Sequence, residues 1–168
     1  MKLADTGLRK QPFLAQGKPL VLVPYSSQRN AIHFLDETRV NKRGLGLFHG
    51  PPLSGKTTIL QQFASSLPRD HAVAIVDGAR TDPAKLLKEI LGQYGYDHGC
   101  NSASERFSMI RVVALQQAAS SQAPVLVIEN VHKMSPVLLE ILCELAEMSF
   151  DGTSALRIIL SSDRPMLP

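Results

Sequence analysis

A short stretch near residue 50 constrains this chain more than any other feature. Residues 50–57 read Gly-Pro-Pro-Leu-Ser-Gly-Lys-Thr, which matches the pattern G-x-x-x-x-G-K-[ST] at each fixed position. This spacing lets backbone N–H groups and the amino end of a helix surround a di- or triphosphate. Because the pattern works only between a strand and a helix, it predicts a local fold as well as a ligand.

The flanks of this loop fit that requirement. The apolar run 44–49 precedes it, and residues 57–64 follow without a helix breaker. The other interpretation, a surface turn of glycine and proline, is disfavoured by these flanks. Lys56 is expected to reach the β- and γ-phosphates, and the Thr57 hydroxyl to hold Mg²⁺. The predicted cofactor contacts are Gly50, Pro51, Pro52, Leu53, Ser54, Gly55, Lys56, Thr57 and Thr58.

Length and composition fit one domain. The chain has 168 residues, of which 44% are hydrophobic. It contains no apolar run of roughly 18 residues and no apolar leader at its start, so we expect no membrane span and a cytoplasmic location. The two cysteines lack C-x-x-C spacing, which argues against a disulfide framework or a zinc site. We expect Cys100 to be a loop thiol and Cys143 a core residue.

Positive charge is concentrated in the first quarter of the chain. Residues 1–43 carry eight basic and three acidic side chains, whereas residues 44–168 carry ten basic and twelve acidic ones. We therefore expect an N-terminal arm and linker over 1–43 and a nucleotide-binding core over 44–168. Nucleic acid is a weaker candidate partner, because the arm has no dense Lys/Arg block and few aromatic residues.

Apolar runs alternate with amphipathic segments along the core. A helix is expected within 28–40, and further helices are expected after the capping pairs Asp82-Pro83, Ser102…Glu105 and Ser135-Pro136. The predicted strands are 44–49, 71–76, 124–129 and 156–160, and the segment 19–24 is expected to be extended. This alternation predicts an α/β fold with a mostly parallel sheet covered by helices on both faces, whose ligand lies at the carboxyl ends of the strands.

A second motif follows the third of these strands. Four apolar residues, 125–128, precede Glu129. A nucleoside triphosphate site needs an acid at the end of a buried strand to fix the Mg²⁺ shell, so Glu129 joins Thr57 as a predicted metal contact. An acid at a strand end is weak evidence by itself and gains weight from the loop. Ser161 and Ser162 follow the fourth strand at the same edge.

With these motifs the chain resembles the AAA+ superfamily of P-loop ATPases. Residues 127–132, Val-Ile-Glu-Asn-Val-His, stand in place of the family's apolar-Asp-Glu-Ala-His, and Ser161-Ser162 stand at its sensor-1 location. Residues 7–13 are similar to the N-terminal signature of a bacterial branch that includes the general-secretion-pathway ATPase and transposition helpers. Residues 24–31 are similar to the segment that leads to the nucleotide base, which makes Pro24 a predicted cofactor contact.

The resemblance implies a P-loop three-layer α/β/α sandwich that binds ATP and Mg²⁺. It also implies a motor or switch that acts on a protein partner or within a homo-oligomer. The implied catalytic residues are Lys56, Glu129, Asn130 and Ser162. The chain ends at Pro168, before the family's fifth strand, arginine finger and helical lid, so we expect a core truncated after the fourth strand.

Three residues depart from the family pattern. Leu53 replaces the middle loop glycine, Glu129 replaces the metal-binding aspartate, and Asn130 replaces the glutamate that polarises the attacking water. Groups that activate water contribute about 10²–10⁴-fold to rate, so slow hydrolysis is expected. A different register would make Glu129 the catalytic glutamate but would leave Ile128 where a metal ligand is needed. A non-hydrolysing nucleotide-binding scaffold and a small-molecule phosphotransferase are the alternative functions.

Overall fold

A four-stranded parallel sheet forms the centre of the molecule. The computed structural model describes residues 26–96 and 99–166. The sheet consists of β1 (Leu45–His49), β2 (Val73–Asp77), β3 (Val125–Glu129) and β6 (Arg157–Ser162), in the order β1-β6-β3-β2. Every neighbouring pair is parallel. The predicted α/β fold with a mostly parallel sheet is therefore confirmed.

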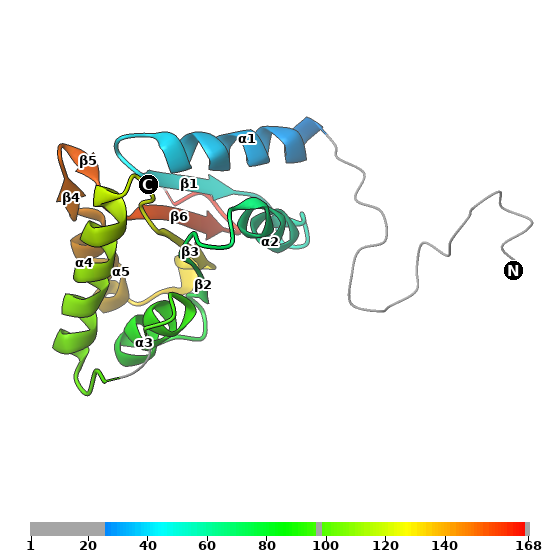
Figure 1. Cartoon of the computed structure of the whole chain (residues 1–168). Helices are drawn as coiled ribbons and strands as arrows, with labels where there is room; N and C mark the ends of the chain where they lie inside the picture. The colour runs from blue at the N-terminus through cyan, green and yellow to red at the C-terminus, as the bar shows by residue number, and fades with distance from the viewer. Residues whose placement is uncertain (1–25, 97–98, 167–168) are drawn as a thin grey trace, which may run out of the picture.

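Helices cover both faces of the sheet (Figure 1). On one face, α1 (Ser26–Val40) and α2 (Lys56–Ser66) share a buried apolar cluster with the side chains of Val125 and Val127. On the other face, α3 (Pro83–Gln93), α4 (Ala103–Ala119) and α5 (Pro136–Ala146) share a larger cluster with Leu126 and Ile128. The alternation of side chains along β3 thus joins both layers of helices to one strand.

The helices begin where the capping residues predict. The Asp82 side chain accepts a hydrogen bond from the backbone N–H of Lys85 at 2.9 Å. Ser102 and Glu105 form a complete capping box at the start of α4, and Ser135 caps α5. These caps satisfy backbone donors that have no partner inside the helix, which fixes the starts of three helices from local sequence alone.

Two details of the fold differ from the sequence predictions. A hairpin of β4 (Ser149–Phe150) and β5 (Thr153–Ser154), joined by Asp151 and Gly152 with positive φ, was not predicted. It consists of two-residue strands, which are too short to show a periodic pattern. The last strand also runs further than expected, because Ser161 and Ser162 still pair with β1.

The prediction for Cys143 is wrong. Its thiol is exposed, whereas Cys100 is half-buried. The buried stripe of α5 is formed by Leu138, Leu142 and Leu145, and residue 143 lies off that stripe. Helical spacing therefore places this cysteine toward solvent, although the helix as a whole is strongly apolar.

The helix α1 packs on the sheet although it belongs to the segment predicted as an arm. Leu35 is completely buried, and Thr38 is 6% exposed. A Cβ added at Gly46 on β1 would lie only 2.5 Å from Thr38 Oγ1, so the glycine permits the close approach of helix and strand. The predicted boundary between residues 43 and 44 thus separates elements that share a core. The segment 19–24 lies outside the described residues.

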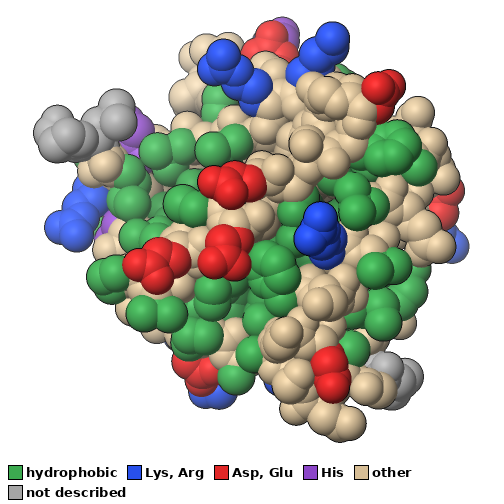
Figure 2. All heavy atoms as spheres, turned by 90° about the vertical axis from the view of Figure 1, so that its left-hand side faces the viewer, with side chains coloured by type: hydrophobic (Ala, Val, Ile, Leu, Met, Phe, Trp, Pro, Cys, Tyr) green, Lys and Arg blue, Asp and Glu red, His purple; other side chains and the backbone are tan. Residues whose placement is uncertain are grey.

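The layer of α4, α5 and the β4–β5 hairpin forms a face on which hydrophobic and acidic side chains are interspersed (Figure 2). Its exposed apolar residues include Val112, Val137 and Phe150. A hollow of about 330 Å³ lies between α4 and the end of α5. Across the described ranges, none of the helices has the length and apolar character needed to cross a membrane.

Candidate nucleotide-binding site

The loop between β1 and α2 has the backbone shape that an anion needs. Gly55 has φ of 87° and precedes the first residue of α2. No side chain among the described residues caps this helix, so the N–H groups of its first turn remain open to a ligand. Gly50 N donates to Ser162 O at 3.2 Å, which ties the loop to β6. The loop thus lies at the carboxyl edge of the sheet.

Leu53 occupies the loop in a left-handed conformation. Its φ is 63°, and its side chain is fully exposed. For a residue with a Cβ this conformation costs roughly 1–2 kcal/mol, which a glycine would avoid. The loop therefore holds Leu53 in a conformation that a glycine at this position would adopt without strain.

All three protons of the Lys56 ammonium have acceptors. Lys56 Nζ donates to Gly50 O at 2.7 Å and to Pro51 O at 2.9 Å. It also pairs with Asp163 Oδ1 at 2.9 Å. The Lys56 hydrogen bond is the main reason why the pKa of Asp163 is lowered, and the charges of Lys56, His132 and Lys133 act in the same direction. A phosphate that reaches Lys56 must therefore replace one of these acceptors.

Thr57 and Glu129 meet at the start of α2. Thr57 Oγ1 donates to Glu129 Oε1 at 2.5 Å, across 72 residues of sequence. Hydroxyl and carboxylate oxygens are the hard ligands that Mg²⁺ takes together with substrate phosphates, so this pair fits the predicted metal contact. Ile128 is completely buried in the cluster on the opposite face. This placement supports the register in which Glu129 is the metal-side acid.

Asn130 lies beside an acid that the sequence analysis did not single out. Its Nδ2 donates to Asp77 Oδ1 at 2.8 Å, and Asp77 is the last residue of β2. Asn130 has φ of 53°, a left-handed conformation that asparagine tolerates better than most residues. The one available signal for Asp77 was an acid that ends an apolar strand, as Glu129 does.

Ser162 is buried and makes local contacts. Its Oγ donates to Arg164 O at 2.5 Å and accepts from Arg164 N at 3.2 Å. Its side chain therefore forms a turn after β6, while its backbone O receives the Gly50 N–H. The next residue, Asp163, supplies the side chain that reaches Lys56. The catalytic role predicted for Ser162 stays a prediction.

The remaining predicted contacts surround the loop or lie outside the described residues. Pro51, Pro52 and Ser54 are exposed, and Thr58 is half-buried on α2. Pro24 falls outside the described ranges. Within residues 26–96 and 99–166, there is no group of three or more His, Cys, Asp or Glu side chains that could hold a metal ion.

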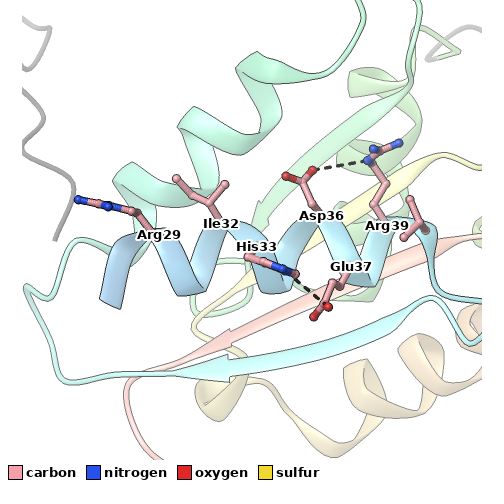
Figure 3. Close-up of a pocket in the computed structure, with 7 residues that line it drawn as sticks. Arg29, Ile32, His33, Asp36, Glu37 and Arg39 are labelled. Atoms are coloured by element: carbon pink, nitrogen blue, oxygen red, sulfur yellow. Dashed lines mark ion pairs between the residues drawn. The ribbon is translucent and has the colours of Figure 1, made fainter. Parts of the chain in front are cut away.

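A surface pocket on α1 is separate from this site. It has a volume of about 520 Å³, and its described lining residues are Arg29, Ile32, His33, Asp36, Glu37, Arg39 and Val40. Figure 3 shows two ion pairs along the helix, His33 with Glu37 at 3.5 Å and Asp36 with Arg39 at 3.8 Å. Pairs at this spacing stabilise a helix modestly, and their side chains do not converge on a common point.

The loop and the strand-end acid both lie within a segment that a comparison of sequences assigns to a known family. A family profile described as "AAA domain" matches residues 38–165. The chain belongs to this AAA domain family. Members of this family are nucleotide-binding ATPases in general. The match confirms the AAA+ superfamily that the sequence motifs predicted. No curated protein matches the chain.

Solved structures of AAA+ proteins share the fold at low sequence identity. The crystal structure of Cdc6p from Pyrobaculum aerophilum is 13% identical, with a TM-score of 0.64 over 88% of this chain and 42% of that one. The structure of Drosophila ORC bound to AT-rich DNA and Cdc6 is 17% identical, with a TM-score of 0.51 over 85% and 54%. This chain therefore spans less than two thirds of either neighbour, and the likeness shows the fold.

Proposed function

We propose that this chain binds ATP with Mg²⁺ and acts as a AAA+ motor or switch on a partner, with slow hydrolysis. The observation that carries the proposal is the convergence of Lys56, Thr57 and Glu129 at the start of α2. Lys56 would hold the β- and γ-phosphates after leaving Asp163. Thr57 and Glu129 would hold Mg²⁺, which would neutralise negative charge on the phosphates.

Slow turnover follows from the chemistry of Asn130. In hydrolysis a water oxygen bonds to the γ-phosphorus, the bond to the bridging oxygen breaks, and ADP, phosphate and a proton result. A carboxylate at position 130 would accept the proton of this water, whereas the amide of Asn130 can only accept a hydrogen bond from it. The expected loss is about 10²–10⁴-fold in rate.

The proposal also includes the branch of the AAA+ superfamily to which the chain belongs and the kind of partner on which it acts. The N-terminal residues 7–13 support a relation to the bacterial secretion and transposition-helper ATPases. A cytoplasmic location is proposed on the separate ground that the sequence has no long apolar run. We favour a protein partner or a homo-oligomer. One structural neighbour is an ORC assembly bound to DNA, which makes DNA a second candidate partner. A non-hydrolysing scaffold is the alternative function, and Asn130 is the residue that favours it.

Phosphate release and nucleotide binding distinguish these functions. The wild-type chain should release phosphate from ATP slowly in the presence of Mg²⁺, and Lys56→Ala should abolish that release. Lys85→Ala is the matched control. Lys85 is an exposed lysine on α3, away from the phosphate loop, and it pairs with Asp82 at 3.3 Å. Tight ATP binding without Lys56-dependent release would refute the ATPase and favour the scaffold. Absence of ATP binding would refute both.

A further inference from the structure

The hydrogen bond between Asn130 and Asp77 fixes which way the Asn130 amide faces. An ionised carboxylate only accepts hydrogen bonds, so the NH₂ group of Asn130 must be the one that faces Asp77 Oδ1. The Oδ1 atom of Asn130 then faces away from Asp77. Within the described residues this oxygen accepts no hydrogen bond, and the side chain is half-buried. An acceptor is thus held in one orientation and left open.

Both partners of this hydrogen bond are themselves held in place. Asp77 Oδ1 also accepts from Ala79 N at 3.0 Å, and Oδ2 pairs with Arg80 Nε at 3.4 Å. Asn130 has a left-handed backbone conformation, and its carbonyl accepts from Lys133 N at 2.9 Å. The amide is therefore fixed at its backbone and at its nitrogen.

The pair lies beside the predicted metal contact. Asp77 and Glu129 are opposite each other in the parallel register of β2 and β3. Ile75, two residues before Asp77, packs against the cluster beneath α1 and α2, as Val127 does two residues before Glu129. Because side chains alternate along a strand, Asp77 and Glu129 project on the α2 side of the sheet. Gly78 N donates to Glu129 O at 2.8 Å, which holds the two strand ends together.

We infer that Asp77 is a positioning residue for hydrolysis: it holds the Asn130 amide so that Oδ1 accepts a hydrogen bond from the attacking water. This inference rests on the proposed function. The water oxygen bonds to the γ-phosphorus, the bridging P–O bond breaks, and the electron pair leaves with ADP. One water proton stays on the new phosphate, and the other passes to solvent. Asp77 takes no part in bond making and acts only through Asn130.

A double-mutant cycle tests this role. Asn130→Gly removes the amide and tolerates the positive φ, and Asp77→Ala removes the acceptor that orients it. Each should lower kcat for ATP by about ten- to hundredfold, as misplacement of a positioned group does. The dissociation constant for ATP should stay within about twofold, because the ground-state contacts are untouched. The double variant should be no slower than Asn130→Gly alone.

Two further variants separate orientation from stability. Asp77→Asn keeps an oxygen that can accept from Asn130 and Ala79, so kcat should stay within about threefold of wild type. Asp82→Ala is the matched control for lost local contacts. Asp82 accepts the Lys85 N–H at 2.9 Å and pairs with Lys85 Nζ at 3.3 Å, much as Asp77 does with Ala79 and Arg80. Asp82→Ala should reduce stability by a similar amount without changing kcat.

The results that would refute the role of Asp77 differ from the result that would refute nucleotide binding. An unchanged kcat in Asp77→Ala, a fully additive double variant, or an Asp77→Asn variant as slow as Asp77→Ala would overturn the positioning role. ATP binding without turnover in the wild-type chain would also overturn it, while nucleotide binding would stand. Failure of the wild-type chain to bind ATP would instead refute the proposed function itself.

Discussion

The ion pair between Lys56 and Asp163 predicts a substitution that strengthens nucleotide binding. Lys56 Nζ lies 2.9 Å from Asp163 Oδ1 and also donates to two loop carbonyls. ATP must take one of these places, and Asp163 is the acceptor that carries the competing charge. Asp163→Asn removes that charge and keeps a polar side chain of the same size. We therefore expect this variant to bind ATP more tightly than the wild-type chain.

The size of the gain follows from the exposure of the pair. The side chains of Lys56 and Asp163 are 12% and 25% exposed, so solvent still screens their attraction. Ion pairs that solvent reaches contribute little interaction free energy, so the dissociation constant for ATP should fall by only about two- to fivefold in Asp163→Asn. The gain should shrink at about 1 M salt, where the Debye length is about 3 Å.

Titration calorimetry with ATP and Mg²⁺, at low and high salt, measures the effect. Asp70→Asn is the matched control, because Asp70 is exposed and precedes β2 at the opposite edge of the sheet. It should leave the dissociation constant unchanged. Weaker binding by Asp163→Asn would show that Asp163 supports the nucleotide directly, and an unchanged constant at low salt would show that the pair does not compete. Either result would refute the reasoning.

Three further predictions concern the metal, the core and pH. Mg²⁺ should increase the affinity of the wild-type chain for ATP, and Thr57→Val should abolish this increase when ATP affinity is measured with and without Mg²⁺. An undiminished increase in the variant would exclude Thr57 as a metal ligand. Phe63 is 1% exposed, so Phe63→Ala should lower the free energy of unfolding, measured in urea, by about 3–5 kcal/mol. Burial, and next the charge of Arg39, lower the pKa of His71 from 6.5. The unfolded chain therefore binds a proton at His71 more readily than the folded chain does. The stability that His71 contributes is present above pH 6.5 and decreases as the pH falls below that value. In urea unfolding curves, His71→Gln should weaken this dependence of the unfolding free energy on pH.

The fold could be predicted where local signals suffice. Ser102 and Glu105 specify the start of α4 through their own hydrogen bonds, and the apolar run 125–128 specifies a strand buried on both faces. The β4–β5 hairpin could not be predicted, because its strands are too short for a pattern. The exposure of Cys143 could have been read from the stripe of α5, since the helical period already places it off that stripe.

The site was predictable as separate motifs but not as contacts. The loop and the strand-end acid identify Lys56 and Glu129 through spacing that their chemistry requires. Asp163 and Asp77 become neighbours of the site only because β6 lies between β1 and β3 and β2 lies beside β3. Strand order is decided by the packing of distant segments, so no local pattern reports it.

The packing of α1 has a mechanical consequence. Gln28 Nε2 lies 3.9 Å from the position that a Cβ would take on Gly55, so one end of the helix lies beside the phosphate loop. About ten residues later, Thr38 packs closely against Gly46, with no room for a Cβ between them. These two points are about 15 Å apart along a stiff helix. A displacement of the loop that pushed on Gln28 would therefore be passed along α1 toward Gly46 and β1.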